Sequence, residues 1–358
     1  MNPPARIALI AARLDSGGVA DHLNSLALTL RARGATVATF AREDYFVKPL
    51  RYGFELGTGN WIGLHFVAYG WAKHGILRRS GIEQIREACA GHHMAIYLHE
   101  LWIGAELGAS VQHRLIGALQ RRGLLRLLSV LQPARVLTSN PVYQAMLARE
   151  GIPATQLPLP GNLPVPSESD RRAAREWLAT AGIHDPASTA LAAVFGLIHP
   201  EWDARVAVAD WYAHAERQKR TPAILALGRH GTAGPRKLAA LREHIPNLRV
   251  ICAGEQPAPL LAGLLAECSL GLATSPWSLI GKSGTAAAFL EAGLPVIVTR
   301  DDWHWRSGPT PAPVPHPRLW KWTPASPFAW DQFLATRDRP APGLAQVTDS
   351  WLQLISER

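Results

Sequence analysis

The chain is poor in cysteine, with three among 358 residues. Cys89, Cys252 and Cys268 lie far apart in sequence and form no Cys-x-x-Cys pair. This usage argues against a disulfide framework and against a cysteine-ligated zinc site, and it fits a reducing compartment. We therefore expect a cytoplasmic protein.

Long hydrophobic runs are also missing. Glu267 and Glu291 interrupt the richest apolar segments before the roughly 18 apolar residues that a membrane-spanning helix needs can accumulate. The first apolar stretch, residues 7–12, is too short for the core of a secretion signal and leads into Asp15 and a glycine pair. The sequence predicts neither a spanning helix nor secretion, and it leaves contact with a membrane surface open.

Acidic residues are outnumbered, since 28 Asp and Glu face 37 Lys and Arg, for a formal net charge of +9. An excess of positive charge favours an anionic partner, such as a phosphorylated ligand, nucleic acid or acidic lipid. No nucleic-acid-binding motif accompanies the basic residues, so no nucleic-acid partner is predicted. Hydrophobic residues make up 47% of the chain and charged residues 18%, which is typical of a globular protein.

The length exceeds what one hydrophobic core usually serves, so two domains are expected. A short apolar run at 6–12, a glycine turn, a segment of helical period at 19–33 and a second apolar run at 35–40 form a strand-helix-strand pattern. A looser version of the pattern recurs between residues 94 and 138. We therefore predict a Rossmann-like domain over residues 1–160.

The proline-rich passage 157–166 cannot continue a helix or a central strand, and we interpret it as an interdomain hinge. Strand-like and helix-like segments alternate again after it, as far as residues 295–298. We predict a second Rossmann-like domain at 161–335 and a C-terminal helix at 336–358 that packs on the first domain. The expected fold class is α/β, with two Rossmann-like domains facing a cleft.

Two segments have more than one interpretation. Residues 301–330 carry five tryptophans among a run of prolines, which favours an irregular loop pinned by apolar rings; an aromatic wall for a sugar or a lipid is the alternative. Residues 113–126 place several arginines among leucines. We favour a core-facing helix with solvated arginines there, and a basic face that contacts anionic lipid is the alternative. The arginines are Arg114, Arg121, Arg122 and Arg126.

Two turns are candidates for binding a phosphate group. Gly17 and Gly18 follow the first strand and precede a helix with unpaired N-terminal amides, although the spacing is not Gly-x-Gly-x-x-Gly. The second turn opens a helix late in the chain and consists of Lys282, Ser283, Gly284 and Thr285. Its charge, hydroxyls and free amides suit a phosphate, but Pro276 replaces the first glycine of a P-loop. A tight connection and ordinary helix capping are the structural alternatives.

His99 directly follows the apolar strand 94–98, at the carboxyl edge where open α/β sheets bind ligands. A histidine there can transfer a proton near neutral pH, so His99 is the candidate catalytic residue. A purely structural histidine is the alternative. No His-Glu-x-x-His or other metal-ligand spacing accompanies it, so no metal site is predicted.

The order of these features resembles the GT-B glycosyltransferases, and within them glycosyltransferase family 4. The Gly17-Gly18 turn with its helix and next strand is similar to that family's amino-terminal glycine turn, and His99 resembles its cleft histidine. Residues 157–165 are similar to the family's crossover between domains, and residues 275–298 resemble its donor loop, helix and following strand. The resemblance spans nearly the whole chain.

The resemblance implies a transferase that moves a sugar from a nucleotide-sugar donor to an acceptor, without a metal or other cofactor. The donor diphosphate would lie on the helix start at 282–285, with Arg229 and Glu291 as further donor contacts and Gly17-Gly18 allowing close approach. His99 would orient the acceptor or relay a proton. The expected location is cytoplasmic, with room for peripheral contact with an anionic membrane.

Four positions depart from the family pattern. Counted back from Gly293, the glutamates of the family's carboxylate pair would fall at Ile280 and Ala288, and its basic pair would fall at Leu197 and Trp202. A GT-B binding or scaffold protein that lost catalysis is therefore a second hypothesis, and a sugar-nucleotide epimerase is a third. Whether the transfer retains or inverts the sugar configuration is left open.

Overall fold

The computed structural model describes residues 6–15, 17–47, 60–324 and 328–356. The chain divides into two compact units. The first comprises Met1–Asn162, Trp303–Ala312 and Leu344–Arg358, and the second comprises Leu163–Asp302 and Pro313–Gly343. The boundary at Asn162 lies inside the proline-rich passage. Residues 303–312 group with the first unit and residues 336–343 with the second, which differs from the limits predicted at 335 and 336.

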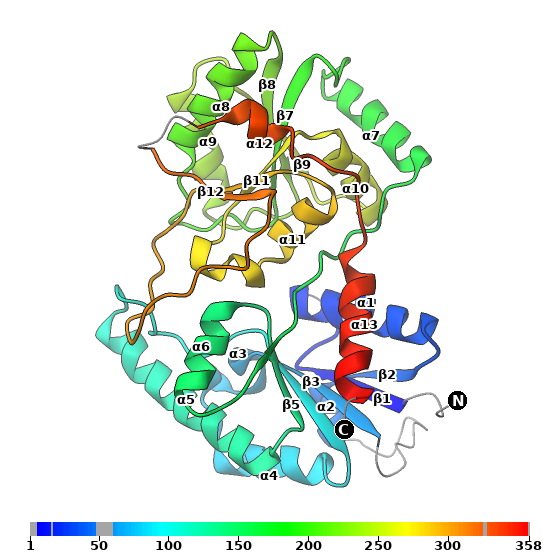
Figure 1. The fold of residues 1–358 in the computed structure, drawn as a ribbon, viewed down its shortest axis with the longest axis vertical. Helices are drawn as coiled ribbons and strands as arrows, with labels where there is room; N and C mark the ends of the chain where they lie inside the picture. Colours follow the sequence, from blue (N-terminus) through cyan, green and yellow to red (C-terminus); the bar gives the residue numbers. More distant parts are fainter. Residues whose placement is uncertain (1–5, 16, 48–59, 325–327, 357–358) are drawn as a thin grey trace. The chain divides into compact units, whose positions relative to one another are not determined.

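The first unit contains a parallel six-stranded sheet with the order β2-β1-β3-β4-β5-β6 (Figure 1). The strands are β1 (Arg6–Ala11), β2 (Thr36–Ala41), β3 (Trp61–Phe66), β4 (His93–Leu98), β5 (Arg135–Thr138) and β6 (Thr155–Gln156). The helices are α1 (Gly18–Ala32), α2 (Arg42–Val47), α3 (Ala68–Trp71), η1 (Lys73–Gly75), α4 (Arg79–Ala88), α5 (Val111–Leu131) and α6 (Pro141–Arg149). Parallel strands are covered on both faces, which explains why β1 is a continuous apolar run.

The last helix, α13 (Gly343–Ser356), lies beside α1 (Figure 1). Its buried residues Val347, Trp351 and Ile355 belong to the apolar core that α1 and β1 also form. The hydroxyls of Thr29 and Thr348 are 2.7 Å apart. Most of the C-terminal segment thus completes the first unit, although the helix begins at Gly343 and not at residue 336.

The second unit contains another parallel six-stranded sheet, with the order β12-β11-β10-β7-β8-β9. The strands are β7 (Thr189–Phe195), β8 (Thr221–Leu227), β9 (Arg249–Gly254), β10 (Leu270–Ala273), β11 (Val296–Val298) and β12 (Leu319–Lys321). The helices are α7 (Glu168–Thr180), α8 (Arg205–Arg217), α9 (Gly234–His244), α10 (Ala258–Glu267), η2 (Trp277–Lys282), α11 (Gly284–Glu291) and α12 (Trp330–Leu334). The strand β12 falls inside the tryptophan and proline segment, which was predicted to be irregular throughout.

The second sheet separates two apolar cores. Along β7, Leu191 and Ala193 pack into one core, whereas Ala192 and Val194 pack into the other. Successive side chains of a strand point to opposite faces, so a strand covered by helices on both faces must be apolar at every position. This is why β7 has no polar alternation.

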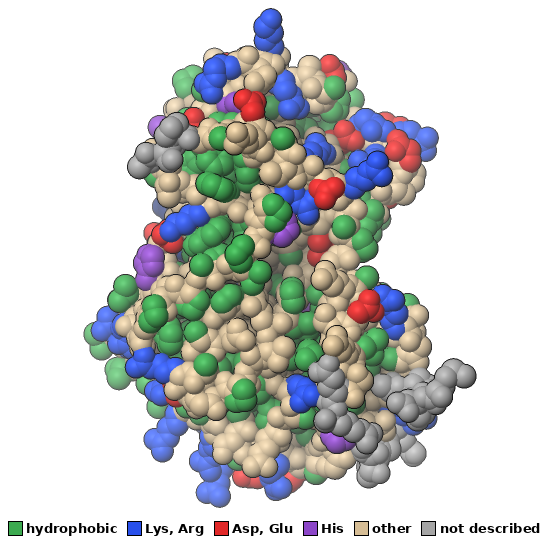
Figure 2. Space-filling model, in the orientation of Figure 1, with side chains coloured by type: hydrophobic (Ala, Val, Ile, Leu, Met, Phe, Trp, Pro, Cys, Tyr) green, Lys and Arg blue, Asp and Glu red, His purple; other side chains and the backbone are tan. Residues whose placement is uncertain are grey.

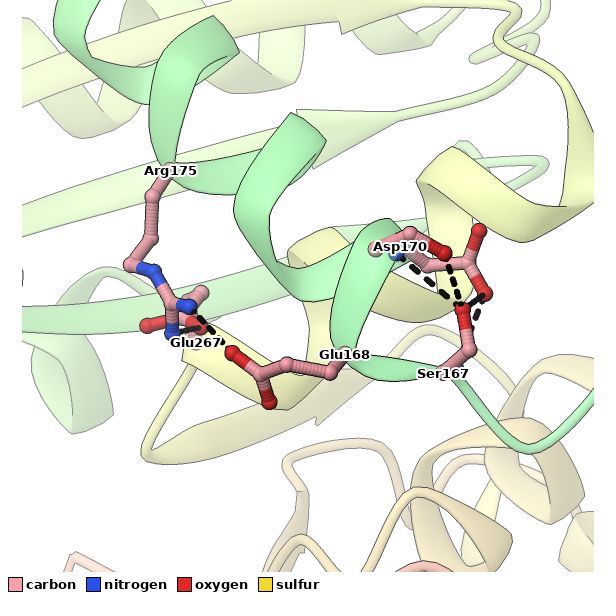
Figure 3. A network of polar contacts seen from close by, with 6 residues as sticks. Ser167, Glu168, Asp170, Arg175 and Glu267 are labelled. Carbon is pink, nitrogen blue, oxygen red and sulfur yellow. Dashed lines mark hydrogen bonds and ion pairs between the residues drawn. The ribbon is translucent and has the colours of Figure 1, made fainter.

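A capping box determines where α7 starts after the proline-rich passage (Figure 3). The backbone amide of Asp170 donates to Ser167 Oγ at 3.2 Å, and the amide of Ser167 donates to Asp170 Oδ2 at 2.8 Å. Arg175 then pairs with Glu168 on its own helix and with Glu267 on α10. A cap of this kind stabilises a helix by about 1 kcal/mol, so the chain enters the second unit at a defined residue.

The helix α5 has the core-facing side and the exposed arginines that we favoured, but not all of its leucines face the core. Leu124 is buried, but Leu115 and Leu119 are each more than half exposed, as is Val111. In the first half of the helix the core therefore lies along the face of Gly117 and Gln120, and the apolar side chains of the opposite face are exposed. Among the described helices, none has the length and apolar character needed to cross a membrane.

Candidate functional site

The strand order of the first sheet reverses at β1, because β2 lies on one side of it and β3 on the other. Ligands of open α/β sheets bind outside the carboxyl ends of the strands at such a point. The loop after β1 ends in Gly17, which has a φ of 102°, and Gly18 opens α1. A Cβ atom at either glycine would meet no atom within 4 Å, so the backbone of this turn can approach a ligand closely.

Three histidines from separate elements of the first unit meet in its core. His22 comes from α1, His65 from β3 and His99 from the residue that follows β4. His65 Nδ1 lies 3.0 Å from His99 Nε2, and each of the three rings offers a nitrogen within 4.8 Å of the other two. The ring of Tyr97 lies 4.3 Å from that of His99 and stacks on that of His65. The predicted place of His99 at the carboxyl edge is confirmed.

Burial keeps the three imidazoles neutral. His22 and His65 are each 1% exposed and His99 is 7% exposed. Desolvation lowers the pKa of His22 to about 4, and desolvation followed by repulsion from neighbouring imidazoles lowers the pKa values of His65 and His99 well below their usual value. A neutral imidazole can accept a proton or bind a metal, so this cluster is chemically able to do either.

His22 and His65 were not predicted as site residues. No spacing rule connects them with His99, because the three residues come from separate elements that only the sheet order brings together. Neither ring nitrogen of His22 has a hydrogen-bond partner among the described residues. Three neutral imidazoles are a donor set that Zn²⁺ accepts, whereas no metal site was predicted.

The strand order of the second sheet reverses at β7, because β8 lies on one side of it and β10 on the other. Gly196 follows β7 with a φ of 72°, and a Cβ atom there would lie 2.9 Å from the Thr285 side chain of α11. Thr274, which follows β10, donates from its hydroxyl to the carbonyl of Leu197 at 2.8 Å. The start of α11 therefore lies at the carboxyl ends of the strands where this sheet reverses its order.

The start of α11 has the predicted cap. The backbone amide of Ala286 donates to Ser283 Oγ at 3.3 Å, and the Ser283 and Thr285 hydroxyls are 3.1 Å apart. Lys282 is the last residue of η2, directly before the cap. The first amides of a helix lack partners within the helix and carry partial positive charge. The structure thus brings Lys282, Ser283, Gly284 and Thr285 together at the positive end of a helix.

The other two predicted donor contacts lie elsewhere in the second unit. Arg229 follows β8 and pairs with Glu255, which follows β9, at 2.6 Å; both side chains are exposed. Glu291 is the last residue of α11, and its carbonyl accepts a hydrogen bond from Ala341. An eight-residue helix separates its ends by about 10 Å at 1.5 Å per residue. The structure therefore does not bring Glu291 to the Ser283 turn.

The positions where the family resemblance expects charge serve other purposes. Ile280, Ala288 and Trp202 are buried. Ile280 and Trp202 belong to the two cores of the second unit. Leu197 is exposed in the loop after β7. A carboxylate at Ile280 or Ala288 would be buried away from solvent, which costs free energy. Apolar residues therefore suit these two positions in this chain.

No family model matches the chain, and no curated protein matches it in sequence. Solved structures do match over nearly the whole length. HepE from Anabaena, solved in complex with UDP and glucose, has a TM-score of 0.54 and 13% identity, covering 98% of this chain and 99% of that chain. An alpha-glucosyltransferase solved in complex with UDP and a 13-mer DNA has a TM-score of 0.53 and 10% identity, covering 99% and 100%. A glycosyltransferase from Rickettsia africae has a TM-score of 0.51 and 11% identity, covering 99% and 93%.

These likenesses establish the fold. The similarity to family 4 in particular stays a prediction, as does every role assigned to a residue. With one parallel six-stranded sheet and its helices in each unit, the chain has the α/β, GT-B fold of these glycosyltransferases.

Proposed function

We propose that the protein is a glycosyltransferase that moves a sugar from a nucleotide-sugar donor to an acceptor. The observation that carries the proposal is the start of α11, where Lys282 and two hydroxyls surround free helix amides at the reversal point of the second sheet. Solved structures of the same fold include HepE in complex with UDP-glucose. A nucleotide diphosphate is the ligand whose charge suits this helix start.

The donor diphosphate would accept hydrogen bonds from the amides of Gly284 and Thr285 and from the hydroxyls of Ser283 and Thr285. As the bond between sugar and diphosphate breaks, negative charge develops on the leaving group, and Lys282 with the helix dipole stabilises it. The scheme uses no metal ion. Arg229 is a second cation for the donor, and we leave Glu291 out because it lies at the other end of α11.

His99 would orient the acceptor hydroxyl and accept its proton. Its Nε2 atom is engaged by His65, and no described residue hydrogen-bonds to Nδ1, which is the nitrogen left for the acceptor. Burial lowers the pKa of His99, so the ring is in the neutral form that can accept a hydrogen bond. The Gly17-Gly18 turn opens the helix that carries His22 and would allow a phosphate or sugar to approach the backbone.

We also propose peripheral contact with an anionic membrane through α5. Val111, Leu115 and Leu119 recur every four residues and form one exposed stripe, and Arg122 and Arg126 follow it toward the end of the helix. Figure 2 shows basic and hydrophobic side chains interspersed on the part of the surface where Figure 1 places α5. A helix of this kind lies in the headgroup region of a bilayer.

Calorimetric titration with UDP-, GDP- and ADP-sugars, followed by product analysis, tests the main proposal. We expect binding of at least one nucleotide sugar and transfer of its sugar to an acceptor. Binding without transfer would favour the protein that lost catalysis, which the apolar Ile280 and Ala288 make the second candidate. No binding of any nucleotide or nucleotide sugar would contradict both.

A further inference from the structure

The first unit contains a cavity that the proposed donor site does not use. It has a volume of about 190 Å³. Its walls come from the loop after β4, from one face of α5, from the end of α6 and from residues 305–307. All four segments belong to the first unit. The part of this loop that lines the cavity begins at Trp102, three residues after His99 along the chain.

Arginine dominates the charge of this cavity. Four arginines line it, together with one acidic residue, Glu150. Glu150 is engaged by Arg121 through two hydrogen bonds of 2.8 and 2.6 Å. Among the described residues, none of the other three arginines forms an ion pair with an acid. These three are Arg114, Arg149 and Arg306. The cavity therefore has an unneutralised positive charge.

The walls are held in place by close packing and by hydrogen bonds from a buried side chain to the backbone. A Cβ atom at Gly117 would lie 1.8 Å from the carbonyl oxygen of Ile103, so only glycine lets the loop approach α5 this closely. The buried amide of Gln120 accepts a hydrogen bond from the Ile103 amide and donates one to the carbonyl of His74. The loop is therefore held against α5, and the walls of the cavity have defined positions.

The segment 303–312 completes the cavity on the other side. Its Arg306 amide donates to the carbonyl of Ala105 at 2.9 Å, and Trp305 forms an antiparallel bridge with Glu106. The Arg149 guanidinium lies 5.8 Å from the centre of the Trp305 ring. This cation–π contact orients Arg149 while leaving its outer N–H groups available. The tryptophan thus gives the cavity an apolar wall beside its charged rim.

We propose that this cavity binds a phosphoryl group carried by the acceptor, with the Trp102 and Trp305 rings contacting the acceptor's apolar or sugar portion. Guanidinium groups present paired N–H donors that match two oxygens of a phosphate, and three of the arginines that line this cavity pair with no acid among the described residues. The assignment of this ligand as the acceptor rests on the proposed function, whereas the phosphate site itself does not.

The test is direct titration of inorganic phosphate and of glycerol phosphate into the full chain. We expect the double variant Arg114→Gln/Arg306→Gln to bind each probe at least about ten-fold more weakly than the wild type, because each lost charged hydrogen bond contributes that much. The matched control is Arg79→Gln, which removes an exposed arginine of α4 outside the cavity and should bind like the wild type. Thermal melting checks that each variant is folded.

Two further arms separate the outcomes. Lys282→Ala should keep phosphate binding in the cavity, and the double variant should keep nucleotide-sugar binding, so failure of one site is told apart from failure of the other. Vesicles of phosphatidic acid in phosphatidylcholine that bind the wild type, and bind the double variant more weakly, would assign the phosphate to a lipid headgroup. Binding of soluble glycerol phosphate alone would assign it to a soluble acceptor. Equal probe binding by wild type and folded double variant, or no binding of any probe by the wild type, would overturn the proposal.

Discussion

His65 Nδ1 and His99 Nε2 lie 3.0 Å apart in a buried hydrogen bond, so one ring donates, the other accepts, and both are fixed in orientation. We expect His99→Gln to lower kcat for sugar transfer about 100-fold, because the hydrogen-bond acceptor for the acceptor hydroxyl is lost. Donor affinity should stay unchanged. The matched control is His113→Gln, an exposed histidine on α5. An unchanged kcat in a folded His99→Gln enzyme would remove His99 from the reaction.

Lys282→Ala should weaken nucleotide-sugar binding about ten-fold, because the charge next to the diphosphate disappears. The thermal midpoint should move little, since Lys282 lies before the helix and is not one of the buried core residues. Calorimetric titration measures the first quantity and a melting curve the second. Arg236→Ala, on the exposed face of α9, serves as a charge-loss control. Wild-type affinity in Lys282→Ala would place the diphosphate elsewhere.

Acid should destabilise the first unit because the buried histidines must charge. The pKa of His22 is about 4 in the folded chain and about 6.5 unfolded, so the unfolded chain takes up its proton first. The contribution of His22 to stability is complete above about pH 6.5 and is lost as the pH falls toward about 4. The difference corresponds to a loss on the order of 3 kcal/mol.

Urea unfolding between about pH 7 and about pH 4 measures this loss. The free energy of unfolding should fall less steeply with acid in His22→Gln, which cannot be protonated, than in the wild type or in His184→Gln, which replaces an exposed histidine. His65 and His99 face the same cluster with lowered pKa values, so part of the slope should remain in His22→Gln. Identical slopes for all three proteins would show that His22 is not the source.

Chelation should leave transfer unaffected. The proposed scheme meets the charge of the leaving diphosphate with Lys282 and the α11 dipole, so the initial rate should be the same with and without EDTA. Metal analysis of the purified protein accompanies the assay, because His22, His65 and His99 could hold Zn²⁺. A rate that EDTA abolishes and an added divalent cation restores would contradict the metal-independent scheme.

Replacing the exposed stripe of α5 should release the protein from anionic vesicles. Leu115→Ser/Leu119→Ser removes two exposed apolar side chains and should reduce binding to phosphatidylglycerol-containing vesicles by about ten-fold or more. Leu28→Ser is the matched control, since Leu28 is an equally exposed leucine on α1. Flotation with pure phosphatidylcholine vesicles should show little binding of any form. If the double variant and Leu28→Ser float alike, α5 is not the contact.

Local patterns were sufficient to predict much of the fold. The apolar run of β1, the glycine turn and the periodic segment of α1 indicate a strand, a turn and a helix from neighbouring residues alone. The hydroxyl of Ser283 likewise predicts the start of α11, because a cap acts within one helical turn. The exposure of Leu115 and Leu119 was not predicted, since periodicity shows that a helix has faces but does not show which face the core covers.

The sequence by itself determined the α/β class, the alternating strands and helices and the two phosphate-suited turns, because each depends on interactions between residues close along the chain. Only the tertiary structure decided that His22 and His65 join His99, that Glu291 lies away from Ser283, and that residues 303–312 enclose an arginine cavity with α5. These outcomes depend on strand order and on packing between distant segments, and no local spacing records either.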